Sequence, residues 1–133
     1  MRIFLDTNVL AAALATRGLC AELFEVTLQS HELLISDSII KELERVLPEK
    51  LGQSEPVTAG FIALLNSEGI LVTTAHTAPP LPDPDDEPIV AAALAGKSDA
   101  FVTGDKALLE LKSIEGMPNI SPRGLWELLA GKD

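Results

Sequence analysis

The sequence predicts a single α/β domain built around a mainly parallel β-sheet. Short apolar segments with strand character alternate with helical segments along all 133 residues. Hydrophobic residues make up 47% of the chain and aromatic residues only 4%, so we expect an aliphatic core. A chain of this length ordinarily forms one domain, and residues 1–133 are expected to be that domain.

The first half of the chain shows clear strand and helix signals. Arg2 opens a short apolar strand, which turns polar in one step at Asp6. Ser36 supplies an N-cap for a helix whose apolar residues recur at helical spacing, and Pro48 is expected to end that helix. In order, we expect a strand at 2–5, helices at 9–14 and 21–28, a strand at 33–35 and a helix over 39–47.

The second half continues the alternation, interrupted by one proline-rich stretch. Residues 74–88 contain too many prolines for regular structure, so we expect a surface loop there. The remaining elements are expected in this order: a loop at 52–56, a helix at 57–65, a strand at 69–73, an apolar run at 89–95, a strand at 100–103, a helix at 106–111, a short strand near 119–120 and a helix at 122–129.

The charge balance narrows the choice of partners. Twenty acidic residues against ten basic ones give a net charge of -10, which disfavours nonspecific binding to long nucleic acids and suits a basic partner segment. The single cysteine, Cys20, cannot form an internal disulfide and fits a reducing cytoplasm. Neither a signal peptide nor a membrane-spanning segment is recognised, so a cytoplasmic location is expected.

Four carboxylates occupy positions that predict one acidic pocket. Asp6 and Asp105 follow apolar strands, Glu42 lies on the helix after a strand, and Asp86 opens the apolar run at 89–95. In open α/β sheets, ligands bind at the carboxyl edge of the strands. Clustered carboxylates repel one another, and Mg²⁺ or Mn²⁺ relieves that repulsion and favours oxygen ligands. This pattern therefore indicates a divalent-metal site suited to phosphate chemistry.

Each acid also has a purely structural interpretation. Asp6 and Asp105 could be N-caps, and Asp86 could stabilise a helix N-terminus, as could its neighbours Asp85 and Glu87. On the helix after the second strand, Glu42 and Glu44 lie on opposite borders of the apolar stripe, so periodicity does not choose between them.

Taken together, the motifs resemble those of the PIN-domain ribonucleases, in particular the VapC-like toxins of prokaryotic toxin–antitoxin systems. The resemblance covers essentially the whole chain and depends on four motifs in order. They are Phe4-Leu5-Asp6-Thr7-Asn8-Val9-Leu10; Ile35-Ser36 followed by Glu42-Leu43; Asp83-Pro84-Asp85-Asp86 leading to Ile89 and Ala91-Ala92-Ala93; and Val102-Thr103-Gly104-Asp105 with Leu108-Leu109.

The resemblance implies a fold and a set of site residues. The fold is a three-layer sandwich with a central parallel sheet of four or five strands flanked by helices. The resemblance selects Glu42 over Glu44. It implies RNA hydrolysis by Asp6, Glu42, Asp86 and Asp105, with Mg²⁺ or Mn²⁺ held by the three aspartates; Asn8, Thr103 and Asp83 are the expected supporting residues.

The resemblance also implies partners: an RNA substrate, a basic antitoxin and a second copy of the chain in a homodimer. An acidic surface repels the phosphate backbone and so disfavours broad RNA binding. The acidic surface therefore favours a small structured target or a bound antitoxin. Two other classes are open. A haloacid-dehalogenase-type phosphohydrolase needs an acid where Asn8 stands, and a noncatalytic PIN-fold interaction domain would keep the fold without the activity.

Overall fold

The sheet is the centre of the molecule. The computed structural model describes residues 1–73 and 76–131, and within them six strands form one sheet in the order β3-β2-β1-β4-β6-β5. All neighbouring strands are parallel except β5 and β6, which form an antiparallel hairpin. The strands are β1 (Arg2–Leu5), β2 (Glu32–Ile35), β3 (Ile70–Leu71), β4 (Ala100–Val102), β5 (Ser113–Ile114) and β6 (Met117–Ile120).

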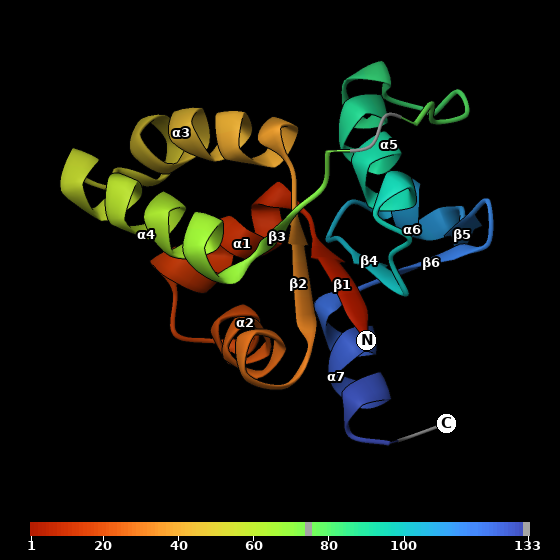
Figure 1. The fold of residues 1–133 in the computed structure, drawn as a ribbon, viewed down its shortest axis with the longest axis horizontal. Coiled ribbons are helices and arrows are strands. Elements are labelled where there is room, and N and C mark those ends of the chain that lie inside the picture. The colour runs from red at the N-terminus through yellow and green to blue at the C-terminus, as the bar shows by residue number, and fades with distance from the viewer. Residues whose placement is uncertain (74–75, 132–133) are drawn as a thin grey trace.

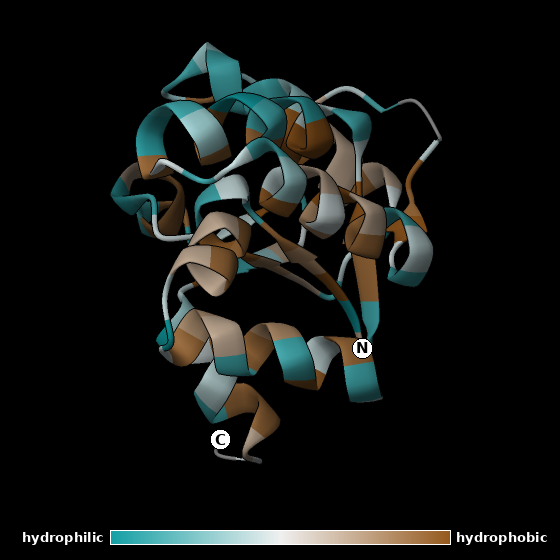
Figure 2. Ribbon diagram, turned by 90° about the vertical axis from the view of Figure 1, so that its left-hand side faces the viewer, coloured by the Kyte–Doolittle hydropathy of each residue, from teal (hydrophilic) through white to brown (hydrophobic). Residues whose placement is uncertain are grey.

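The central strands form the most buried part of the core. Phe4 of β1 is opposite Leu34 of β2 on one side and Phe101 of β4 on the other, and all three side chains are buried. The rings of Phe4 and Phe101 stack with their centroids 5.7 Å apart. Figure 2 shows these inner strands as the hydrophobic centre, with hydrophilic residues on the outer helices. A strand buried on both faces needs a continuous apolar run, as the sequence of β1 provides.

Helices lie on both sides of the sheet, and Figure 1 shows α3 and α4 as a pair on the opposite side of the view from α5 and α6. Three of the helices begin at a serine: Ser36, Ser54 and Ser121 cap α3, α4 and α7 with their hydroxyl groups. The helices are α1 (Thr7–Ala15), α2 (Leu19–Ser30), α3 (Asp37–Leu51), α4 (Glu55–Glu68), α5 (Glu87–Ala95), α6 (Lys106–Glu110) and α7 (Pro122–Leu129), with a 3₁₀ turn, η1, at Pro84–Asp86.

The α/β fold class is confirmed, and the sheet contains more than the four or five parallel strands predicted. The additional strand is β5, only two residues long, which pairs antiparallel with β6 at the edge of the sheet. Its signal is a tight turn, where Glu115 and Gly116 both have positive φ, as two-residue hairpin turns require. A two-residue strand is too short to show an alternating pattern, so the sequence did not reveal it.

Several predicted boundaries were wrong. Pro48 does not end α3, which continues to Leu51 and stops at Gly52, a residue in the left-handed conformation. Proline has no N–H group, so it removes one hydrogen bond to the carbonyl four residues earlier. The residues after it can still donate their own N–H groups and complete the final turn. The expected loop at 52–56 is shortened because Ser54 caps α4. The expected strand 69–73 is reduced to β3.

The proline-rich stretch is more ordered than predicted. Residues 74 and 75 lie outside the described part of the chain, but Pro84–Asp86 form η1 and α5 begins at Glu87. Prolines favour the first turn of a helix, which explains why Pro84 and Pro88 begin helical structure instead of preventing it. None of the described helices is both long and apolar enough to cross a bilayer.

Two glycines of the α4 region give a matched test of packing. A Cβ at Gly69 would lie 2.6 Å from the carbonyl oxygen of Leu65, whereas a Cβ at Gly60 meets nothing within 4 Å. We expect Gly69→Ala to lower the free energy of unfolding by about 1–3 kcal/mol. The control Gly60→Ala should raise it by about 0.5–1 kcal/mol, because alanine favours a helix interior. Urea denaturation measures both; equal stability of the two variants would contradict the packing at Gly69.

Candidate active site

The predicted acids come from neighbouring elements at the carboxyl edge of the sheet. Asp6 follows β1, Asp105 follows β4 after two residues, and Glu42 lies in the second turn of α3, the helix after β2. Strand β1 is paired with β2 on one side and with β4 on the other. The segments that carry Asp6, Glu42 and Asp105 therefore leave the sheet from neighbouring strands. Asp86 reaches this region by a different route, as the last residue of η1.

Asp6 is the most buried of the four carboxylates, with 8% of its surface exposed. Oδ1 accepts a hydrogen bond from the backbone N–H of Thr7 (2.8 Å), and Oδ2 accepts one from the hydroxyl of Thr103 (2.8 Å). Burial raises the pKa of Asp6 above its ordinary value, the two hydrogen bonds oppose that rise, and repulsion from Glu42 and Asp105 adds to it. Asp6 is also the N-cap of α1, as its structural interpretation predicted. A role of the same carboxylate in metal binding stays a prediction.

Thr103 connects the ends of β1 and β4. Its hydroxyl donates to Asp6 and accepts the backbone N–H of Asp105 at 3.1 Å, and its side chain is completely buried. A hydroxyl can donate one hydrogen bond while accepting another, which a methyl group cannot do. The residue therefore fixes the relative position of two of the predicted acids; a catalytic contribution from Thr103 stays a prediction.

Asp105 combines a capping role with a partly open carboxylate. Its Oδ1 accepts the backbone N–H groups of Ala107 (2.8 Å) and Leu108 (3.3 Å), which makes it the N-cap of α6. Among the described residues, no donor reaches Oδ2. One oxygen thus orients the side chain while the other stays available for a ligand.

Asp86 carries the strongest sign of uncompensated charge. Partial burial is the main cause that raises its pKa to about 6, and repulsion from Asp105, Asp83, Asp6 and Glu42 raises it further. Its side chain forms no capping hydrogen bond with α5. The N-terminal stabilisation proposed as an alternative for Asp86 therefore does not take the form of a side-chain cap.

The structure distinguishes the two glutamates that periodicity left equal. Glu42 is half-buried and close enough to Asp6 and Asp86 to raise the pKa of both. Glu44 is exposed and faces away from the acids, lining a groove of ≈ 390 Å³ between α3 and α4 with Pro48 and Glu55. Only Glu42 belongs to the acidic cluster, which we define as Asp6, Glu42, Asp86 and Asp105.

The other predicted supporting residues are more exposed. Asn8 lies in the first turn of α1 with its side chain exposed, and Asp83 is exposed and caps η1 through the backbone N–H of Asp85 (2.9 Å). Asp83 is close enough to Asp86 to raise its pKa. The functional roles assigned to Asn8 and Asp83 stay predictions.

The chemistry of the acidic cluster fits a hard divalent cation, although its geometry is not that of a finished metal site. All four donor groups are carboxylates, and Mg²⁺ and Mn²⁺ favour oxygen ligands. Within the described ranges, however, no group of three or more His, Cys, Asp or Glu side chains is already arranged to hold one ion. Mutual repulsion opposes close approach of bare carboxylates, so ion binding requires the side chains to draw together.

Sequence reasoning missed one buried polar residue behind the site. Asn119 of β6 donates from Nδ2 to the carbonyl of Leu108 at 2.9 Å and so attaches the short helix α6 to the sheet. Asp105 is the N-cap of the same helix. The available signal was an asparagine inside an otherwise apolar strand. Such a residue is expected to be buried, and a buried side-chain amide needs a hydrogen-bond partner.

Comparison with known proteins identifies the family and agrees with the fold. The family model of the PIN domain matches residues 2–107. Among solved structures, the chain is similar to the crystal structure of VapBC2 from Rickettsia felis bound to a DNA fragment from their promoter. That match has 12% sequence identity and a TM-score of 0.64, and covers 91% of this chain and 98% of the other. No curated protein sequence gives a significant match.

The chain belongs to the PIN domain family. PIN domains are in general nucleases that use divalent metal ions. The part that the acidic cluster plays in such chemistry stays a prediction. The haloacid-dehalogenase alternative is set aside, because the matching family is a different one.

Without a bound cation, the raised pKa of Asp86, caused mainly by its partial burial and further by repulsion from the neighbouring acids, should make stability depend on pH. Its pKa of about 6 in the folded chain exceeds the ordinary 3.8, so between these values the folded state holds more protons than the unfolded state. Stability therefore falls as the pH rises from about 4 to about 6 and levels off above. After allowance for solvent screening, we expect Asp86 to contribute roughly 1 kcal/mol of this loss.

Urea denaturation in EDTA across this pH range measures the effect. Asp86→Asn should remove part of the decline, whereas Glu49→Gln, which removes one exposed negative charge elsewhere on α3, should leave it in place. If Asp86→Asn showed the same pH dependence as the wild-type chain, the raised pKa of this carboxyl would be wrong.

Proposed function

We propose that this PIN domain is a divalent-metal-dependent endoribonuclease, and that it is the toxin of a toxin–antitoxin pair acting in the cytoplasm. The observation that carries the proposal is the acidic cluster: Asp6 is buried at the end of the central strand, and Glu42, Asp86 and Asp105 are close enough to perturb it or one another. Burying a charge beside like charges is unfavourable, so its retention favours a role in binding a cation.

In our proposal each residue of the site has its own role. Asp6, Asp86 and Asp105 hold one or two Mg²⁺ or Mn²⁺ ions, which would polarise the scissile phosphate and activate a water. Glu42 orients that water, with Asn8 and Asp83 as supporting residues. Thr103 holds Asp6 in place through its hydroxyl.

The structural neighbour supports a protein partner. The matched structure is a VapBC2 complex, bound to a DNA fragment from its promoter. A basic antitoxin is the partner we propose for this chain, since the net charge of -10 attracts Lys and Arg side chains. We further propose a homodimer; Trp126 (41% exposed) and Leu128 (45% exposed) of α7 offer apolar surface for contact with a second copy.

A noncatalytic interaction domain is the main competing proposal. It would keep the fold and the antitoxin, and would use Asp6 only as the N-cap of α1 and the acceptor of the Thr103 hydroxyl. The two proposals differ in what they predict for metal-dependent RNA cleavage, which the purified chain can be tested for directly with varied RNAs and with Mg²⁺, Mn²⁺ or EDTA.

Replacement of Asp6 by asparagine tests the catalytic proposal. Asp6→Asn should reduce RNA cleavage in Mn²⁺ by at least about a hundredfold, since it removes a metal-binding charge. The fold should be kept or stabilised, because a buried charge is lost while the amide can still accept the N–H of Thr7. Gel-based cleavage and thermal unfolding measure the two effects.

The matched control is Glu44→Gln on α3, which removes one carboxylate outside the acidic cluster. It should cleave at the wild-type rate. Full activity of Asp6→Asn in Mn²⁺ would contradict the mechanism, and complete inactivity of the wild-type chain toward all RNAs would favour the interaction domain.

The antitoxin proposal predicts inhibition that depends on salt. We expect the product of the neighbouring reading frame to bind the chain and block RNA cleavage through basic side chains that reach the carboxylates. Binding should weaken as salt rises, because exposed charges are screened over about 8–10 Å at physiological ionic strength. Co-purification followed by cleavage assays at several salt concentrations measures this. A neighbour that neither binds nor inhibits would leave an orphan nuclease as the better explanation.

A further inference from the structure

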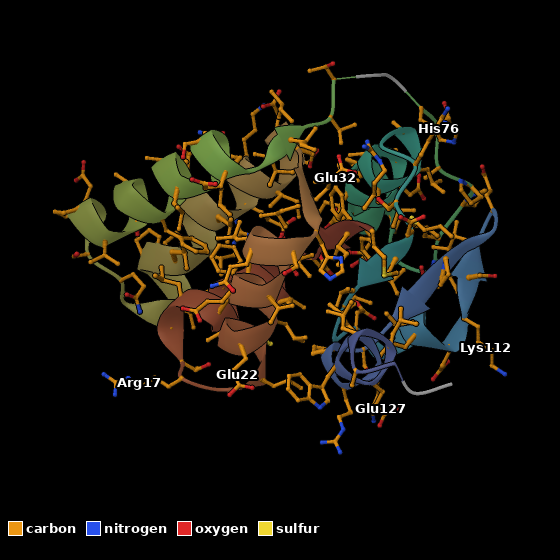
Figure 3. The ribbon with its side chains drawn as sticks, turned by 60° about the horizontal axis from the view of Figure 1, so that its bottom comes forward. Arg17, Glu22, Glu32, His76, Lys112 and Glu127 are labelled. Atoms are coloured by element: carbon orange, nitrogen blue, oxygen red, sulfur yellow. The ribbon has the colours of Figure 1, made fainter. Side chains whose placement is uncertain are left out.

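A few buried polar atoms of this chain have no hydrogen-bond partner. Among the described residues they are the Oγ1 atoms of Thr7 and Thr58 and the Oδ1 atom of Asn119. Surface groups do not have this difficulty, because they reach water: Figure 3 shows Arg17 and Lys112 projecting from opposite margins of the molecule. A buried hydroxyl without a partner is unfavourable, since it has given up its hydrogen bonds to water and gained none. Each such atom in a folded protein therefore calls for an explanation.

One of these atoms, the hydroxyl oxygen of Thr7, lies beside the acidic cluster. Thr7 is the first residue of α1, with 1% of its surface exposed, and its backbone N–H donates to Oδ1 of Asp6 at 2.8 Å. A threonine Oγ1 lies roughly 3–4 Å from its own backbone nitrogen in any staggered rotamer, so the hydroxyl of Thr7 is within about 7 Å of that carboxylate oxygen. The hydroxyl is therefore next to Asp6 whichever rotamer it adopts.

The usual partner of a helical threonine is out of reach for Thr7. Thr27 of α2, for comparison, donates to the carbonyl oxygen of Leu23, four residues earlier, at 2.7 Å. For Thr7 the corresponding carbonyl belongs to Ile3, inside β1, where the backbone is paired with the neighbouring strands β2 and β4. The Oγ1 atom is also closed to water in this arrangement. A partner can therefore come only from a change in the groups around it.

The carboxylates of the acidic cluster are the groups expected to move. Within the part of the chain that the structure describes, no three His, Cys, Asp or Glu side chains are already arranged to hold one ion, so cation binding has to draw the acids together. Asp6 also has acceptor capacity to spare. An ionised carboxylate offers about four lone-pair sites, and the described donors to Asp6 are the Thr7 N–H and the Thr103 hydroxyl. A buried donor without an acceptor thus lies beside a buried acceptor that is only partly used.

We propose that Thr7 is a positioning residue of the metal site: its hydroxyl donates to the Asp6 carboxylate when the acids draw together around a divalent cation, and holds that carboxylate in its binding orientation. This inference rests on the proposed metal-dependent function and adds a residue to the site. Hydrogen bonds from neighbouring groups orient metal-binding side chains, and their loss typically lowers metal affinity by about tenfold to a hundredfold. The hydroxyl gains a partner only in the bound state, so it shifts the equilibrium toward that state.

Replacement of threonine by valine isolates the hydroxyl, because valine has nearly the same shape and forms no side-chain hydrogen bond. The test variant is Thr7→Val, and Thr7→Ser keeps the hydroxyl. Thr58→Val is the matched control: Thr58 is 7% exposed and its hydroxyl also has no partner, but it lines the groove between α3 and α4, outside the acidic cluster. Thermal unfolding in EDTA and at several Mn²⁺ concentrations gives the stability of the free chain and the apparent Kd for Mn²⁺.

In EDTA, both valine variants should unfold about 2–5 °C above the wild-type chain, because each loses a buried hydroxyl that has no partner. In Mn²⁺, Thr7→Val should show an apparent Kd raised by about tenfold, while Thr58→Val keeps the wild-type value. Thr7→Ser should keep most of the Mn²⁺ affinity. A hydroxyl with a purely structural role would change the unfolding temperature equally in both solutions and leave the Kd for Mn²⁺ unchanged.

The outcomes separate this inference from the proposed function. If the wild-type chain binds Mn²⁺ and cleaves RNA while Thr7→Val binds Mn²⁺ as tightly as Thr58→Val, the role of Thr7 is wrong and the nuclease stands. If Thr7→Val alone loses Mn²⁺ affinity and the wild-type chain cleaves no RNA, the nuclease is wrong and the role of Thr7 stands. Unfolding of Thr7→Val below the wild-type temperature in EDTA would mean that the hydroxyl already has a partner in the free chain, which overturns the inference. A wild-type chain that Mn²⁺ does not stabilise overturns both.

Discussion

The burial of the Asp6 carboxylate is the constraint on which the rest of the site depends. Its two oxygens are held by the Thr7 N–H and the Thr103 hydroxyl, so a single side chain fixes the start of α1 and ties the end of β1 to the end of β4. The hydrogen bond from Asp105 to Thr103 extends the same connection to α6. A carboxylate accepts these bonds best when charged, while burial favours its neutral form. The site is therefore built around a charge that the fold only partly stabilises.

This conflict has an energetic consequence for the chain. The packed aliphatic core supplies the stability, and the acidic cluster reduces it whenever the four carboxylates are charged together. Proteins keep such unfavourable groupings at sites where a ligand relieves them. A bound divalent cation would convert the repulsion into attraction, so binding and folding would be thermodynamically coupled. Among the described residues no group of three or more such side chains is already arranged to hold one ion, so cation binding would have to draw the carboxylates together.

Much of the fold and part of the site could be predicted from sequence, for a physical reason. Buried parallel strands need apolar runs, and an acid directly after such a run must lie at the sheet edge, which placed Asp6 and Asp105 correctly. Asp86 follows no strand; it opens the apolar run at 89–95 beside Asp85 and Glu87, and the resemblance to a family selected it among these acids. The choice of Glu42 over Glu44 depends on how α3 packs, which periodicity does not contain. Pro48 and β5 were misjudged because a helix can absorb a proline in its last turns and a two-residue strand carries no pattern.

The charge distribution connects the fold to the way we propose it is used. Because acidic groups outnumber basic ones two to one, electrostatic attraction of RNA can come only from the few basic side chains. The same imbalance makes the surface attractive to a basic protein, which gains from every exposed carboxylate and not only from those at the sheet edge. The charge of the whole surface would thus favour a basic antitoxin over RNA. An acidic body would in this way restrict the nuclease and recruit its inhibitor through one property of the sequence.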